Sequence, residues 1–303
     1  MKLTENGIRV LQALASYYVL TASMVHRAVF PQRKDRRNTR RLLQHLVTDH
    51  YVARSAVNVA FSTGNSGPAY YLTAKGADAL AVYYGDEAWL QTNVRPPRID
   101  RLYHWLDIAE AHWIVETAVN RAAGVTLNGW LNEWQTINDE QGEPTSYVLH
   151  TQFREGPKPL SCSPDAAFCL EVAGHRRVHY VEVDRGTTGA KRVAASKVPG
   201  YAELLDTQGH RRHFPGTTFD DFAVLIITTS PNRRDILRSC VAGHDDLHPE
   251  QWLFVALEEF TPQNALFGKV IHDYRGGVGP LLEKPAAEIA VDQPHTSQPV
   301  TAK

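Results

Sequence analysis

The sequence predicts an α+β protein in two parts, an N-terminal unit of short helices with a β-hairpin and then an α/β domain. In the first fifty residues, apolar side chains recur at helical spacing in separate segments, and two strand-like segments follow, joined by a turn rich in Gly and Asn. After residue 125, apolar strands alternate with amphipathic helices, as in a sheet with helices on its faces.

The N-terminal unit is expected to contain three helices, a hairpin and a fourth helix. Thr4 and Thr21 are placed to cap the first two helices, because a threonine hydroxyl accepts a hydrogen bond from the first turn. The turn TGNSGP joins the two strands of the hairpin. The predicted elements are helices at 3–18, 22–30, 38–50 and 73–85 and strands at 51–61 and 69–73.

Three short helices followed by a hairpin are the order of a winged helix-turn-helix, in which the third helix enters the DNA major groove. Basic residues crowd the third helix and the preceding loop, and Asn38 adds an amide of the type that reads adenine. We therefore predict double-stranded DNA as a partner; the alternative is a solvated basic helix that serves a protein contact. The DNA-binding candidates are Arg33, Lys34, Arg36, Arg37, Asn38, Arg40 and Arg41.

Composition limits the other possibilities. The 303 residues carry 32 Lys+Arg and 33 Asp+Glu, so any affinity for DNA must come from local patches. The three cysteines form no CxxC pair, which is typical of a reducing compartment. The N-terminus lacks the apolar core of a signal peptide, and no apolar run reaches the length of a membrane span. A cytoplasmic location and no membrane partner are expected.

Shifts in composition divide the chain. The stretch NVRPPR is the best linker candidate and precedes one long apolar helix at 99–123, while the C-terminal end is rich in Pro, Ala and Thr. The predicted divisions are a DNA-binding domain at 1–92, a linker and connecting helix at 93–124, the α/β domain at 125–282 and a disordered tail at 283–303.

Three acids and a lysine are expected to gather at one edge of the sheet. Asp165 precedes an apolar strand, and the next strand ends in Glu182 and Asp184, which share a face because side chains alternate along a strand. A helix then carries Lys197 and Tyr201 one turn apart. Carboxylates and a lysine in this arrangement can hold a divalent metal beside a phosphodiester. The alternative is that all are solvated residues at strand ends.

The motif residues resemble the PD-(D/E)XK nuclease core, in which an acid at the start of one strand and an ExK on the next surround a metal. Pro164-Asp165 is similar to the PD, and Glu182-Val183-Asp184 is similar to the ExK except that Asp184 stands where lysine is expected. Lys197, on the following helix, is the candidate replacement.

This resemblance implies Mg²⁺ or Mn²⁺ as cofactor, with Asp165, Glu182 and Asp184 as metal ligands. Lys197 and Tyr201 complete the implied catalytic set. Two further acids, Glu110 and Glu133, are weaker candidates for an accessory carboxylate.

More narrowly, the basic winged helix, the long Trp-containing helix and the pattern PDAAFCLE…VEVDRGT…K…Y resemble the replication-relaxation family of bacterial plasmids and integrated elements. The resemblance covers roughly residues 4–260. It implies a role in replication, DNA relaxation or mobilisation, with DNA and other replication or mobilisation proteins as partners, and leaves both monomer and homodimer open.

Three functions remain open on the sequence. The first is a DNA-binding replication or mobilisation protein with a nuclease-like domain. The second is an active Mg²⁺-dependent DNA endonuclease of a mobile element or defence system. The third is a winged-helix transcriptional regulator whose α/β domain dimerises or senses a ligand.

Overall fold

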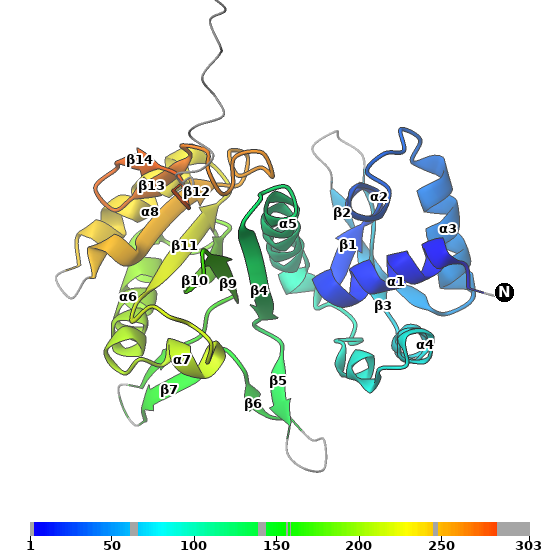
Figure 1. Cartoon of the computed structure of the whole chain (residues 1–303), viewed down its shortest axis with the longest axis horizontal. Coiled ribbons are helices and arrows are strands. Elements are labelled where there is room, and N and C mark those ends of the chain that lie inside the picture. The colour runs from blue at the N-terminus through cyan, green and yellow to red at the C-terminus, as the bar shows by residue number, and fades with distance from the viewer. Residues whose placement is uncertain are drawn as a thin grey trace, which may run out of the picture.

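The computed structural model describes residues 3–60, 66–138, 144–155, 157, 159–244 and 248–283. A small N-terminal unit lies beside a larger sheet domain, and helix α5 (Leu102–Val119) lies between them (Figure 1). The first half of the predicted hairpin turn TGNSGP (63–65) and nearly all of the predicted tail (284–303) lie outside the described residues. No helix in the described part of the chain is long and apolar enough to cross a membrane.

The N-terminal unit contains the predicted helices and hairpin. The side chains of Thr4 and Thr21 accept hydrogen bonds from the backbone and cap α1 and α2, as expected. The strand β1 (Val19–Thr21) was not predicted, because three residues are too few to show a periodicity. It pairs with β3 (Ser66–Leu72), which in turn pairs with β2 (Val52–Ala60), so that the sheet has the order β1-β3-β2. The elements are α1 (Glu5–Tyr17), β1 (Val19–Thr21), α2 (Ala22–Val29), α3 (Arg37–Thr48), β2 (Val52–Ala60), β3 (Ser66–Leu72) and α4 (Ala74–Tyr84).

The start of α4 is held tightly against the hairpin. Thr73 caps the helix through the N–H of Gly76 and donates its hydroxyl to the Tyr51 carbonyl at 3.0 Å. A Cβ at Gly76 would lie 2.3 Å from that same carbonyl oxygen, so glycine is required for this close approach. The TAKG stretch therefore fixes α4 against the strand that follows α3.

The larger domain is built on a mixed seven-stranded sheet of order β14-β13-β12-β11-β10-β9-β4. Strands β10, β11 and β12 are parallel, and the other neighbours are antiparallel. A two-residue turn, with Ala173 and Gly174 both at positive φ, joins β9 to β10. The strands are β4 (Val125–Asn132), β9 (Ala166–Val172), β10 (His175–Asp184), β11 (Phe222–Thr228), β12 (Trp252–Ala256), β13 (Ile271–Asp273) and β14 (Val278–Gly279).

Helices cover both faces of this sheet. Helix α5 packs with Val181 and Val183 on one face, while α6 (Ala190–Asp206) and α8 (Pro231–Ala242) pack with Tyr180 on the other (Figure 1). The segment that the sequence marks as a linker and connecting helix thus forms α5, which also contacts α1 and β1. Its apolar residues are distributed all round because it is buried on both sides.

Smaller elements complete the fold. The polar segment between β4 and β9 contains two small two-stranded sheets. The HRRH segment is a short helix, in which His210 is buried and His213 hydrogen-bonds the Tyr180 hydroxyl at 2.6 Å. These elements are β5 (Thr136–Asn138), β6 (Pro144–Tyr147), β7 (Thr151–Arg154), β8 (Leu160–Cys162), α7 (His210–His213) and the 3₁₀ turns η1 (Glu87–Gln91), η2 (Ile99–Arg101) and η3 (Pro249–Gln251).

Candidate functional site

Asp165 is fixed by the backbones of the strands on either side of it. Its N–H donates to the Val181 carbonyl at 3.2 Å, and its carbonyl accepts from the Glu133 N–H at 2.9 Å. One side-chain oxygen, Oδ2, accepts from the Val183 N–H at 2.7 Å. Asp165 is therefore held at the end of the sheet, with its other oxygen, Oδ1, available to a neighbour.

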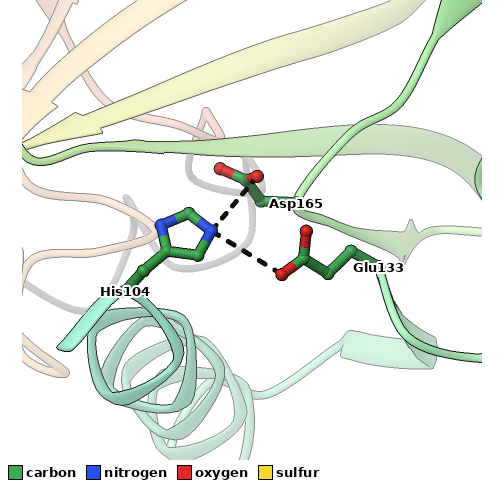
Figure 2. Close-up of side chains that lie close together, drawn as sticks. All are labelled: His104, Glu133 and Asp165. Carbon is green, nitrogen blue, oxygen red and sulfur yellow. Dashed lines mark ion pairs between the residues drawn. The ribbon is translucent and has the colours of Figure 1, made fainter. Parts of the chain in front are cut away.

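That neighbour is His104, in the first turn of α5. Its Nε2 lies 3.3 Å from Asp165 Oδ1 and 3.8 Å from Glu133 Oε1 (Figure 2). One ligand atom from each of the three residues lies within 4.8 Å of the others, and this is the one such group of three or more metal-ligand side chains among the described residues. An imidazole and two carboxylates thus converge from α5, from just after β4 and from just before β9.

The three residues fit a divalent metal. His104 Nε2 is shielded from solvent and has no hydrogen-bond partner among the described residues, although it is within ion-pair distance of two carboxylates. The nitrogen thus has carboxylate neighbours but no hydrogen bond within the described part of the chain, and a bound cation would supply the missing partner. Glu133 is oriented by Trp105, whose Nε1 donates to Oε1 at 2.6 Å, and by Arg101, whose Nη2 lies 3.6 Å from Oε2.

The other face of the same sheet end carries Glu182 with Lys197 and Tyr201. Lys197 Nζ lies 2.7 Å from both carboxylate oxygens of Glu182 and donates to the Ser163 carbonyl at 3.0 Å. The Tyr201 hydroxyl donates to Glu182 Oε1 at 2.7 Å. Lysine and tyrosine, one turn apart on α6, thus reach the acid of the strand from the same side.

A glycine allows α6 to lie this close to the edge of the sheet domain. A Cβ at Gly200 would lie 2.5 Å from the carbonyl oxygen of Ser161, in β8. Any other residue at this position would push α6 away from β8, and with it the Lys197 and Tyr201 side chains that meet Glu182.

Burial and charge shift the ionisation of these groups. Burial raises the pKa of Glu182 to about 7, with a further rise from the Asp165 charge, while Lys197 and Tyr201 act in the opposite direction. Burial opposes the charged form of His104, but the nearby carboxylates of Asp165 and Glu133 outweigh it and raise the pKa of His104. Burial likewise opposes the charge on Asp165, yet His104 and Lys197 hold the pKa of that carboxyl below its usual value.

The remaining candidate acids, Asp184 and Glu110, pair with residues outside the site. Asp184 accepts two hydrogen bonds from Arg233 of α8, at 2.5 and 3.0 Å, rather than pairing with Arg185 or Lys197. Arg185 instead pairs with Asp107 of α5. Glu110 pairs with Arg27 of α2 and so joins α5 to the N-terminal unit.

The predicted DNA-binding residues form an exposed surface on α3 and the loop before it. All seven side chains are exposed, and no ion pair engages the six basic ones within the described ranges. The buried His26 fixes the loop, with Nδ1 2.8 Å from Thr39 Oγ1 and Nε2 2.7 Å from the Arg33 carbonyl oxygen. Thr39, Leu43 and Leu46 are buried, which turns Arg37 and Arg41 outward.

The sequence motifs do not include His104, and they give Glu133 only as a weak candidate. A topological signal was present in the chain order. A helix joined by a short turn to the next strand runs antiparallel to it, so the start of α5 must lie near the end of β4. A histidine in the first turn of the helix and an acid just after the strand are then expected to meet.

The chain thus combines two parts. One is a mixed α/β domain with a cluster of ligand-type side chains at one end of its sheet, and the other is a helical unit with an exposed basic helix. The family model for replication-relaxation matches residues 11–217, more than half of the chain. The chain therefore belongs to the replication-relaxation family, as the sequence motifs predict.

Other comparisons add less. No curated protein gives a significant match. Among solved structures, restriction endonuclease FokI is similar with 11% sequence identity over 84% of this chain and 68% of that chain, at a TM-score of 0.22.

Proposed function

We propose that this protein binds double-stranded DNA of a plasmid or other mobile element during replication, relaxation or mobilisation, and that its sheet domain is a metal-dependent endonuclease of the PD-(D/E)XK type. The observation that carries the endonuclease proposal is the contact of Lys197 Nζ with both oxygens of Glu182 at 2.7 Å. Although Asp184 occupies the usual lysine position, a lysine from α6 reaches the same acid.

The residues around Asp165 and Glu182 supply the remaining requirements of such a site. Asp165 is the acid before β9 and Glu182 the acid on β10, the positions that hold Mg²⁺ or Mn²⁺ in this type of core. A bound metal would polarise the scissile phosphate and lower the pKa of a water molecule. Lys197 offers a cation for the charge that develops on the phosphate. Tyr201 holds Glu182 in place through its hydroxyl. Asp184 is occupied by Arg233 and has no part in this proposal.

The N-terminal unit is proposed to be a winged helix-turn-helix that binds the duplex. Its elements follow the order helix, strand, two helices and two strands, with α3 in the position of a recognition helix. The exposed arginines of α3 suit phosphate and guanine contacts. Binding in this way would bring duplex DNA to the chain that carries the metal site.

Nicking of supercoiled plasmid in the presence of Mg²⁺ or Mn²⁺ tests the endonuclease proposal. We expect the full chain to nick the plasmid, and both Lys197→Met and the double variant Asp165→Asn/Glu182→Gln to lose about 100-fold or more in rate. Circular dichroism must show that the variants are folded. Equal rates for all proteins would contradict the proposal and indicate a contaminating nuclease. Tight duplex binding without nicking would leave a DNA-binding replication or mobilisation role.

A further inference from the structure

We propose that His104, Glu133 and Asp165 form a nitrogen-containing metal site that binds Mn²⁺ in preference to Mg²⁺. This inference rests on the proposed function and revises its ligands: His104 and Glu133 join Asp165 as metal ligands, and Glu182 is left to Lys197 and Tyr201. It would assign a metal-binding role to His104, which the sequence motif does not include, and it moves the centre of metal binding toward α5.

The ligand types favour this choice. Mg²⁺ takes oxygen ligands and keeps several waters, whereas an imidazole nitrogen adds affinity for Mn²⁺ and the later divalent metals. Here one imidazole nitrogen faces two carboxylate oxygens, at 3.3 Å from Asp165 and 3.8 Å from Glu133. When the imidazole is in its neutral, metal-binding form, the two carboxylates bring two formal negative charges, which suit a divalent cation.

The surroundings hold each ligand in place. The Val183 N–H binds Oδ2 of Asp165 and leaves Oδ1 facing His104. Trp105 and Arg101 orient the carboxylate of Glu133. Partners of this kind, which fix ligand orientation from outside the metal site, are characteristic of built metal centres. Within this cluster, His104 Nε2 is shielded from solvent and makes no hydrogen bond with any described residue.

Lys197 explains why the metal would sit on the α5 side of Asp165. Both oxygens of Glu182 contact the Lys197 ammonium at 2.7 Å. A metal ion bound to these oxygens would therefore be repelled by the positive charge of the lysine. On the opposite face, His104 and Glu133 come from α5 and from just after β4. The sheet end therefore separates a lysine side from a metal side, with Asp165 between them.

Metal binding by the full chain without DNA tests this inference. Mn²⁺ and Mg²⁺ affinities would be measured by calorimetry, and electron spin echo modulation from ¹⁴N would report a nitrogen ligand on Mn²⁺. We expect the wild type to bind Mn²⁺ at least about 10-fold more tightly than Mg²⁺ and to show ¹⁴N modulation. His104→Ala should lose the modulation and about 10-fold or more in Mn²⁺ affinity, with little change for Mg²⁺.

Two control variants make the result specific. His175→Ala removes an exposed histidine at the start of β10 and should bind Mn²⁺ as the wild type does. Glu133→Gln should weaken both metals because it removes a charged oxygen ligand.

Absence of ¹⁴N modulation in the wild type, or equal Mn²⁺ affinity for His104→Ala, would overturn the inference and leave His104 as an ion-pair partner of the two acids. Because no DNA is present, failure of nicking does not affect this result. A protein that binds Mn²⁺ through His104 but never nicks DNA would support the inference and refute the endonuclease proposal.

Discussion

At the scale of single residues, Glu182 is the acid that side chains of α6 contact. It is 6% exposed and receives hydrogen bonds from Lys197 and Tyr201. Removing one member of a buried ion pair leaves the other charge without compensation, which costs more than removing both. Lys197 keeps 30% of its side chain exposed, so solvent reduces the effect.

We therefore expect Lys197→Met to lower the free energy of unfolding by about 2 kcal/mol near neutral pH. The loss should be greatest above pH 7, where Glu182 is charged, and should shrink as acid neutralises that carboxyl. Urea denaturation at several pH values measures both.

The double variant Lys197→Met/Glu182→Gln should recover part of this loss, because no charge remains buried. Lys191→Met is the matched control, since Lys191 is exposed on the same helix and should change stability by no more than about 0.5 kcal/mol. If the two lysine variants lose equal stability, the pair with Glu182 does not stabilise the fold.

At the scale of elements, α3 presents its arginines on the face opposite its buried residues. Arg37 and Arg41 are four residues apart, on one exposed face, while Leu43 and Leu46 anchor the helix to the N-terminal core. Such a helix would contact DNA through charge, and each phosphate that it neutralises would release counterions.

We expect Arg37→Ala/Arg41→Ala to weaken duplex binding and to reduce the slope of log K against log salt by about 0.9 for each phosphate that the protein no longer neutralises. Fluorescence anisotropy with a labelled duplex across a salt series measures the slope. The control Arg121→Ala/Arg275→Ala removes the same charge from exposed positions outside α3 and should leave that slope nearly unchanged. An equal change in both variants would indicate that α3 is not the DNA-binding surface.

At the scale of the whole molecule, four rings stack through the core from α5 across three strands. His112 lies 4.2 Å from Trp130, Trp130 lies 5.3 Å from Phe168, and Phe168 lies 4.9 Å from His179, in nearly parallel planes. Burial lowers the pKa of both histidines to about 3. The unit formed by α5 and the sheet is therefore stable with neutral histidines at both ends of the stack.

The pH dependence of stability follows from these two histidines. A histidine in the unfolded chain has a pKa of about 6.5, so the unfolded state binds protons first as the pH falls. The folded state is therefore not penalised by these histidines above pH 6.5, and its free energy of unfolding falls progressively toward pH 3. At pH 5, each histidine should lower the free energy of unfolding by about 2 kcal/mol relative to its value above pH 6.5.

His112→Phe keeps an aromatic ring in the stack but removes the titrating group. We expect the fall in unfolding free energy between pH 6 and pH 4 to be shallower than in the wild type by about 1.4 kcal/mol per pH unit. His45→Phe, at an exposed position on α3, is the control. Identical slopes for wild type and His112→Phe, measured by chemical denaturation, would show that His112 is not held neutral by burial.

The sequence determined the local elements and two pairs of residues on them, Glu182 with Asp184 on β10 and Lys197 with Tyr201 on α6. Helical and strand periodicities, with the threonine caps, specify nearly all the helices and the long strands, since these signals depend on neighbours within a few residues. The alternation of side chains along β10 and the helical spacing along α6 are equally local signals. They predicted Glu182 and Asp184 on one face of the strand and Lys197 and Tyr201 on one face of the helix.

The tertiary structure alone decided which groups meet across elements. His104 joins Asp165 and Glu133, and Asp184 is taken by Arg233, because the ends of α5, α8 and the strands pack together although they are distant in the chain. Periodicity gives the face on which a side chain lies, but not which residue of a distant element faces it. The metal site proposed at His104 therefore follows from packing, while the acids of the motif follow from the sequence.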